Sequence, residues 1–213
     1  GPAGTPTTLG NSTGSVGILI MSNGTANLRR LVVANNGYGY VSMENQAVMN
    51  ITEGIYMPND SANNGVGTGL LVLASADTVL NVTNGNFRLG GTWGGNITTP
   101  EGARGSFGHL IVSNGTVNVK LLAPGQAGNG QVTILNGTIQ QSSTAFADGL
   151  KIANSSEGGT GLVVLAHANA VLFMPSNNLV MGNAANGTAR LVISNGVATV
   201  RAVQMGGLAS QTN

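Results

Sequence analysis

The stretch Gly105–Val132, GSFGHLIVSNGTVNVKLLAPGQAGNGQV, decides the fold because it occurs twice. Residues Gly14–Val41, GSVGILIMSNGTANLRRLVVANNGYGYV, match it at a constant offset of 91 positions, with 14 of 28 paired residues identical. Both copies contain Ser-Asn-Gly-Thr, at Ser22–Thr25 and Ser113–Thr116. A fixed period of this kind predicts a repeat architecture, in which each unit buries its apolar face against its neighbours.

Seven units align on a shared apolar core. Short runs rich in Val, Ile, Leu and Thr, separated by Gly and Asn, favour strands over helices. The first core column holds Leu19, Val41, Leu71, Leu110, Val132, Val163 and Leu191. Two residues later stand Met21, Met43, Leu73, Val112, Ile134, Leu165 and Ile193. Because strand side chains alternate with a period of two, both columns are predicted to point inward.

The units follow an ABC-ABC-A order. The first unit resembles the fourth, and the second, Gly37–Asp60, aligns with the fifth, Gly128–Ser155, if four residues are inserted. The third and sixth units, beginning at Thr68 and Thr160, share 11 of 24 residues. We therefore predict an all-β fold, a parallel β-helix (β-solenoid) of about seven coils. A β-propeller is the main alternative, but its blades need about 40 residues and more aromatic side chains.

This fold predicts one domain with short tails. Residues 1–13 are small and polar and indicate a tail or a lid over the first coil. Residues 14–207 form the single β-solenoid domain, with insertions confined to Gly- and Asn-rich loops, and residues 208–213 form a C-terminal tail.

Composition excludes several classes of function. Charged residues make up 7% of the chain, against about 25% in typical proteins, and the net charge is +1. A nucleic-acid partner would need a basic surface that this sequence lacks. No apolar run approaches the ~20 residues of a membrane helix, so no membrane insertion is expected. The chain has no cysteine, which excludes disulfides and thiolate chemistry.

A polar column lies two residues beyond the second core column. Its members are Asn23, Asn45, Ser75, Asn114, Asn136, His167 and Asn195. Asn tolerates left-handed backbone conformations and suits a corner between strands. We predict a corner ladder in which these side chains hydrogen-bond from coil to coil. His167 is interpreted as a corner residue rather than a catalytic or metal-binding one, and His109 is likewise given no catalytic or metal-binding role.

An apolar stripe is expected on the outside. Between the two core columns lie Ile20, Ser42, Val72, Ile111, Thr133, Val164 and Val192, of which five are aliphatic. Strand propensity alone accounts for Val and Ile on a half-exposed sheet. The alternative is a stripe covered by another chain, a loop or glycans.

Ten N-x-[ST] triplets are candidate glycosylation sites. The favoured candidates lie in long loops: Asn59, Asn96, Asn154 and Asn186. Less favoured are Asn11, Asn50, Asn81, Asn23, Asn114 and Asn136. The alternative is structural, since Asn-Gly makes a turn and Thr opens the next strand. An Asn stacked in a ladder cannot also carry a glycan.

No catalytic, cofactor-binding or metal site is predicted. The acidic residues are Glu44, Glu53, Asp60, Asp77, Glu101, Asp148 and Glu157. They form no close pair suited to sugar hydrolysis. Lys120 and Arg201 occupy equivalent positions after the second strand of A-type coils, where a solvated edge is the simplest interpretation. A degenerate polysaccharide-active enzyme is therefore the least favoured function.

The repeated pattern G-x-L-x-[VI]-S-N-G-T-[VA]-N-[VL], at Gly17–Leu28 and Gly108–Val119, resembles autotransporter passenger solenoids and the strand-repeat surface proteins of bacteria. The resemblance extends over residues 14 to about 207. It implies secretion, a right-handed parallel β-helix and a role as a stalk, adhesin or matrix fibre.

The ends of the repeat suggest a function. Solenoids normally carry polar capping repeats, yet Arg190–Met205 has the pattern of an interior coil. Either the chain is cut from a longer one, or copies stack end to end into a fibre. We expect an extracellular or cell-surface structural protein that assembles head to tail with itself into a filament or stalk. Lateral self-contacts or covalent glycans would be further partners. The alternative is a carbohydrate-binding adhesin or spike segment.

Overall fold

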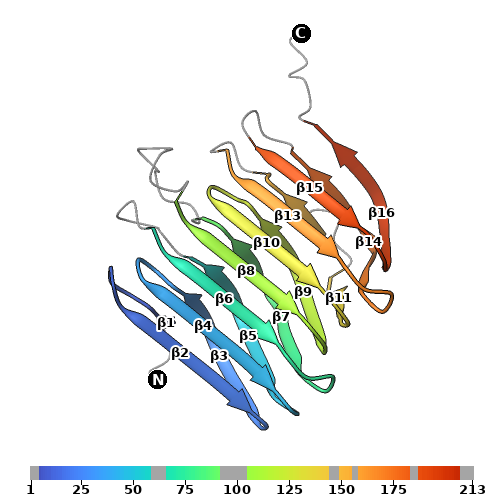
Figure 1. The fold of residues 1–213 in the computed structure, drawn as a ribbon. Helices are drawn as coiled ribbons and strands as arrows, with labels where there is room; N and C mark the ends of the chain where they lie inside the picture. Colours follow the sequence, from blue (N-terminus) through green and yellow to red (C-terminus); the bar gives the residue numbers. More distant parts are fainter. Residues whose placement is uncertain are drawn as a thin grey trace.

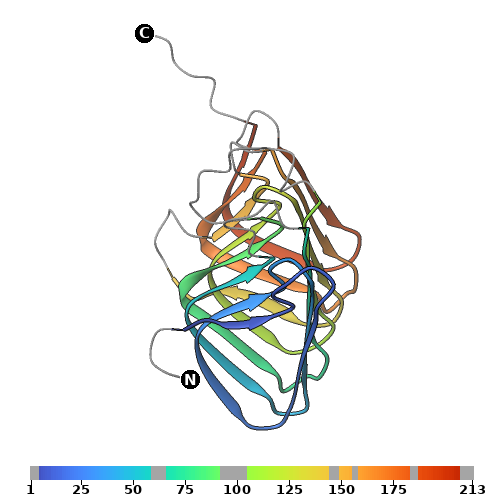
Figure 2. The same ribbon diagram turned by 90° about the vertical axis from the view of Figure 1, so that its left-hand side faces the viewer.

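The structure, a computed structural model, describes residues 5–58, 66–91, 105–143, 149–154, 158–182 and 187–206. These residues form two sheets in which every strand pairing is parallel, as predicted for a β-solenoid. Successive coils follow one another along a rod from the blue end to the red end (Figures 1 and 2). Among the described residues there is no helix.

Each coil contributes one strand to a seven-stranded sheet. To a nine-stranded sheet it contributes one long strand, which in the fifth coil is divided into two. The seven-stranded sheet contains β2 (Val16–Ser22), β4 (Tyr38–Glu44), β6 (Thr68–Leu73), β8 (Phe107–Val112), β10 (Asn129–Ile134), β13 (Thr160–Leu165) and β15 (Thr188–Ile193). The nine-stranded sheet contains β1 (Thr7–Leu9), β3 (Thr25–Val33), β5 (Val48–Met57), β7 (Val79–Leu89), β9 (Thr116–Pro124), β11 (Thr138–Gln141), β12 (Gly149–Ile152), β14 (Val171–Met181) and β16 (Val197–Met205). β1 lies within the segment that the sequence indicated as a tail or lid.

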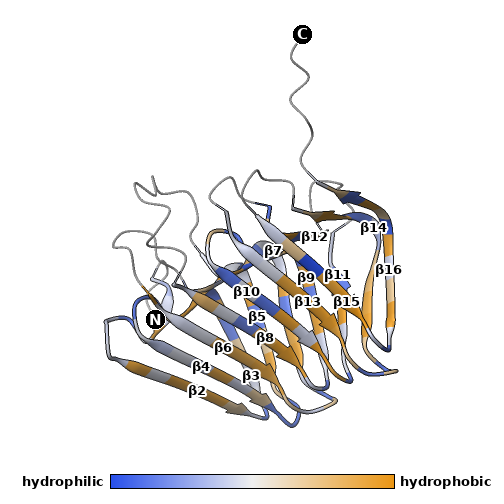
Figure 3. Ribbon diagram, turned by 45° about the horizontal axis from the view of Figure 1, so that its top comes forward, coloured by the Kyte–Doolittle hydropathy of each residue, from blue (hydrophilic) through white to orange (hydrophobic). Residues whose placement is uncertain are grey.

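The predicted register of the seven coils is confirmed. Leu19 pairs with Val41, and each later member of the first core column pairs with the next, as far as Leu191. The second core column is paired in the same way, from Met21 to Ile193. In the five interior coils both columns are fully buried. In Figure 3, hydrophobic segments of neighbouring strands, coloured orange, lie side by side along the sheet.

The long strands of the nine-stranded sheet bend part-way along. The register shifts between Leu28 and Arg30 in β3, and equivalent shifts occur in β5, β7 and β14. Such bulges bend a strand and increase its twist. In the fifth coil the chain divides here into β11 and β12. The extra residues of that coil therefore fall at the bend, where an insertion leaves the paired segments in register.

A glycine column allows the two sheets to meet at one edge. Its members face inward and are the second residue of each strand in the seven-stranded sheet. They are Gly17, Gly39, Gly69, Gly108, Gly130, Gly161 and, in the last coil, Ala189. A Cβ on Gly130 would lie 2.5 Å from the Leu89 carbonyl oxygen, and a Cβ on Gly161 2.5 Å from that of Pro124. Backbone on the opposite side thus fills the space of a side chain. This column was not predicted from the sequence.

We predict that Gly130→Ala destabilises the solenoid, because its new methyl group overlaps fixed backbone. Overpacking typically costs about 1–3 kcal/mol of unfolding free energy. The urea midpoint of unfolding should fall accordingly. Ala189→Gly, in the same column at the open last coil, is the matched control and should cost no more than about 1 kcal/mol. Equal midpoints for Gly130→Ala and the parent protein would contradict the close approach of the sheets.

Candidate functional site

The last coil leaves inward-facing side chains uncovered. Val163 and Leu165 are fully buried in β13, whereas their partners in β15 are exposed through the open end: Leu191 is half-buried and Ile193 is 49% exposed. These residues belong to the apolar core columns, so the core continues to the surface at this end.

The second strand of the last coil repeats the arrangement. Val203 and Met205 in β16 pair with Leu179 and Met181. They are 55% and 74% exposed, although Leu179 is only 2% exposed. Since exposed apolar clusters mark interaction surfaces, the C-terminal end is a candidate assembly surface.

The first coil presents a similar surface at the other end of the rod. Leu19 and Met21 are half-buried, whereas Val41 and Met43, their partners one coil later, are fully buried. Ala26 and Leu28 in β3 are also half-buried and pack against the core from one side. β1 covers only Leu31–Val33 of this coil.

Both ends also expose hydrogen-bonding edges. Within the described part of the chain, β2 pairs only with β4, β15 only with β13, and β16 only with β14. The free edge of such a strand presents a row of backbone N–H and C=O groups that can pair with another chain. The open ends thus combine apolar side chains with edges ready to extend both sheets.

The predicted outer stripe faces away from the core. Ile20 is 60% exposed at the end of the sheet, and Val72, Ile111 and Val164 are half-buried between neighbouring strands. Ser42 is an exception at 3% exposed, and its hydroxyl donates to Glu44 Oε1 at 2.9 Å.

The first three residues of the predicted corner ladder lie at a turn. Asn23 and Asn45 have φ angles of 67° and 53°, in the left-handed region. The side-chain nitrogen Nδ2 of Asn45 donates to Ser22 Oγ at 2.6 Å, and the backbone N–H of Asn45 donates to Ser75 Oγ at 2.9 Å. The side-chain hydrogen bonds of Asn45 to the neighbouring coils therefore involve serine hydroxyls.

Farther along the rod, the corner carries amide-to-amide bonds. Asn136 Nδ2 donates to Asn114 Oδ1 at 2.8 Å. In the following coil, Asn169 Nδ2 donates to Asn136 Oδ1 at 2.7 Å, so Asn169 and not His167 continues the ladder. His167 Nδ1 instead accepts from the Asn169 backbone amide at 3.2 Å, and Asn195 is exposed on the last coil.

A longer amide ladder lies on the outer face of the nine-stranded sheet. It joins Asn27, Asn50, Asn81, Asn118 and Gln140 across five coils through bonds of 2.7 Å. Each bond runs from a side-chain nitrogen to the Oδ1 of the preceding coil. This ladder was not predicted from the sequence, although Asn27 and Asn118 occupy the same place in the repeated stretch.

The candidate glycosylation sites differ in their surroundings. Asn59, Asn96 and Asn186 lie outside the described residues. Asn154 is half-buried, and its Oδ1 has no hydrogen-bond partner among the described residues. Asn11 is exposed and accepts from Asn35 Nδ2 at 3.2 Å. Asn50 and Asn81 belong to the amide ladder, while Asn23, Asn114 and Asn136 lie at the corner.

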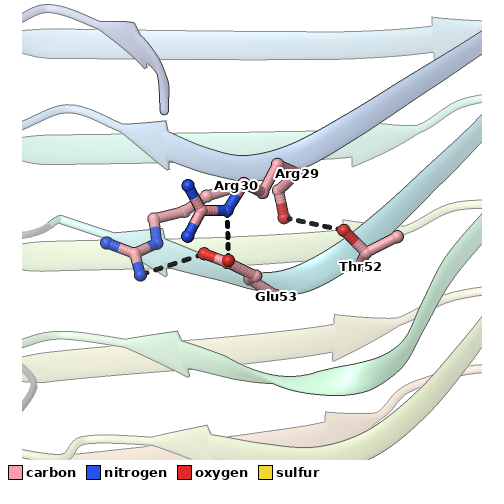
Figure 4. A network of polar contacts seen from close by, with 4 residues as sticks. All are labelled: Arg29, Arg30, Thr52 and Glu53. Carbon is pink, nitrogen blue, oxygen red and sulfur yellow. Dashed lines mark hydrogen bonds and ion pairs between the residues drawn. The ribbon is translucent and has the colours of Figure 1, made fainter. Parts of the chain in front are cut away.

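Several of the few charged residues gather where the nine-stranded sheet bends. Glu53 is paired with Arg29 and with Arg30, whose Nη2 lies 3.1 Å from Glu53 Oε2 (Figure 4). The Arg30 guanidinium lies 5.5 Å from the centre of the Tyr56 ring, within the range of a cation–π contact. Tyr56 pairs with Arg88, whose pKa is lowered by burial and raised to a lesser extent by Tyr56.

A depression of about 420 Å³ lies beside this cluster. Its lining includes Arg30, Glu53, Tyr56, Asn84, Asn86 and Lys120. The amides and charged groups can bind hydroxylated ligands through hydrogen bonds, whereas the Tyr56 ring, at 7% exposed, offers little surface for stacking. This site was not predicted from the sequence, since its residues come from four different coils.

Among the residues that the structure describes, the remaining titratable groups form no recognisable catalytic arrangement. His109 Nε2 lies 2.9 Å from Thr133 Oγ1 and its ring meets Phe107 edge-on, while burial lowers its pKa. Over the described ranges, no three His, Cys, Asp or Glu side chains lie close enough to hold a metal ion. No helix in this part of the chain is long and apolar enough to cross a membrane.

Comparisons with known proteins identify no relative. No protein-family model matches the chain, and neither a curated protein nor a solved structure matches it significantly.

Proposed function

We propose that this chain is a structural, non-enzymatic protomer of an extracellular filament or stalk that grows by end-to-end stacking of solenoids. The observation that carries the proposal is that, within the described residues, the first and last coils leave core columns exposed beside unpaired strand edges. Stacking buries both kinds of surface at once. The C-terminal coil of one copy meets the N-terminal coil of the next, and such a heterologous contact repeats without closing.

The composition supports assembly. A net charge near zero gives little repulsion between copies. The apolar residues at the ends match in kind, with Leu191 and Ile193 on one end and Leu19 and Met21 on the other. The resemblance of the repeated motif to bacterial surface proteins supports an extracellular or cell-surface location.

A pair of neighbouring variants tests the stacking surface. Ile193→Lys places a charge on the inward face of β15, whereas Val192→Lys places the same charge on its outward face. Burying an isoleucine is worth about 1.5–3 kcal/mol. Ile193→Lys should therefore raise the critical concentration for assembly at least about tenfold in sedimentation assays, and Val192→Lys less than about twofold.

Circular dichroism of both lysine variants checks that the solenoid remains folded. Parent protein that stays monomeric at every concentration would overturn the proposal. Equal effects of the two lysines would place the contact elsewhere on the molecule.

We also propose that the filament carries glycans on loop sites and not on the amide ladder. The nitrogens of Asn50 and Asn81 each donate a 2.7 Å bond to the preceding coil, and a sugar there would separate coils about 4.8 Å apart. Peptide mapping of the native protein by mass spectrometry should find sugar masses among Asn59, Asn96, Asn154 and Asn186, with Asn50 and Asn81 unmodified. Ten unmodified sites would contradict this proposal.

The polar depression supports a second candidate function, carbohydrate binding by an adhesin or spike. Asn84 is exposed there, beside Asn86 and the Tyr56 ring. If the depression binds sugars, the parent protein should bind a subset of a glycan array and Asn84→Ala should weaken that binding at least about fivefold. Thr160→Ala, exposed on β13 of the other sheet and away from the depression, is the control. Absence of binding to any glycan would exclude this function.

A further inference from the structure

The short strand β1 occupies an edge that a stacked copy would need. Thr7, Thr8 and Leu9 pair with Leu31, Val32 and Val33 at the end of β3. The Ala34 amide donates to the Leu9 carbonyl at 3.0 Å, and Gly10 follows with a φ of 59°. β1 thus adds three residues to a sheet whose other strands are mostly much longer.

The end of β16 has the same local structure. Val203, Gln204 and Met205 pair with Leu179–Met181 of the previous coil, and Gly206 follows with a φ of 80°. The pairings from coil to coil place Leu179–Met181 in the same columns as Leu31–Val33. β1 therefore holds the position that Val203–Met205 of a preceding coil would occupy.

We propose that the end of β16 from a second copy displaces β1 from β3 when two copies stack. This inference rests on the proposed end-to-end assembly and specifies its interface. Both segments require the same backbone groups of Leu31–Val33, so they cannot be bound together. β1 would then act as a removable cover on the N-terminal end.

Burial favours the exchange. Thr7 and Leu9 face inward from β1, and the replacing residues at these positions are Val203 and Met205. These two are 55% and 74% exposed in the single chain. β16 also brings its first half, Val197–Val200, which would pair with Thr25–Leu28, a segment that β1 does not cover.

The amide ladder provides a matching contact at the same junction. Every later member donates its side-chain nitrogen to the coil before it, but Asn27 Nδ2 has no acceptor among the described residues. In the stack, Thr199 would occupy the column of Asn27, because it pairs with Phe173 and Phe173 with Gln140. Its hydroxyl can accept the bond from Asn27 and extend the ladder between copies.

Engineered disulfides test the exchange cleanly because the chain has no cysteine of its own. Directly paired residues on parallel strands lie about 4.8 Å apart at Cα, within the range of a disulfide. Thr8→Cys with Val32→Cys should lock β1 onto β3 when oxidised. We expect the oxidised form to assemble at least about tenfold more slowly than the same protein after reduction, measured by light scattering.

A second pair of engineered cysteines again uses position 32 on β3. Val32→Cys with Gln204→Cys places the two thiols at opposite ends of one chain, so a bond can form only between copies. Assembled protein should give a series of disulfide-linked oligomers after denaturation, whereas the Val32→Cys single variant should give none beyond a dimer.

The outcomes separate the two levels of the proposal. If reduced protein assembles and the oxidised β1 lock assembles equally fast, the strand exchange is wrong while end-to-end stacking stands. Filaments without cross-links between Val32→Cys and Gln204→Cys would have the same meaning. If parent and reduced variants never assemble, both the proposed function and this inference are overturned.

Discussion

The solenoid depends on the close approach of two sheets along the glycine column. At this edge the backbone of one sheet lies where side chains of the other would be, as the 2.5 Å separation between a hypothetical Gly130 Cβ and the Leu89 oxygen shows. The sheets diverge from there to enclose Val, Leu, Ile and Met side chains. Only Ala189, beside the open end, departs from glycine.

Repetition of this cross-section determines how the rod is stabilised. Each interior coil is covered on both faces by neighbours, so the columns from Val41 to Val163 are fully buried. Outside the core, the ladder from Asn27 to Gln140 adds coil-to-coil hydrogen bonds. Within the part of the chain that the structure describes, the first and last coils have a full neighbouring coil on one side only. Their exposed apolar side chains follow directly from the same geometry that stabilises the interior.

Much of the fold could be predicted from the sequence, because parallel in-register stacking converts sequence columns into spatial columns. The two core columns, their inward direction and the seven coils were predicted in this way. The bend was not predicted, since a bulge depends on local register rather than on apolar period. The fifth coil has additional residues at this bend, between Gln141 at the end of β11 and Gly149 at the start of β12.

The polar surface was harder to predict than the core. Asparagine suits both a left-handed corner and a ladder on a flat sheet, and composition alone does not distinguish the two. Asn23 has the first role, with a φ of 67°, while Asn27 has the second. The depression near Tyr56 combines residues from four coils and has no single motif. β1 was missed because Thr7–Leu9 is too short to show a period.

Cryo-electron microscopy of the assembled protein tests the central claim most directly, namely that copies continue one another's sheets. Seven coils at about 4.8 Å each predict an axial rise of about 34 Å per subunit. The strand spacing should run unbroken through the junction, with Val203–Met205 beside Leu31–Val33 of the next copy. Discrete particles at high concentration, or fibres joined through the outer face of a sheet, would contradict it.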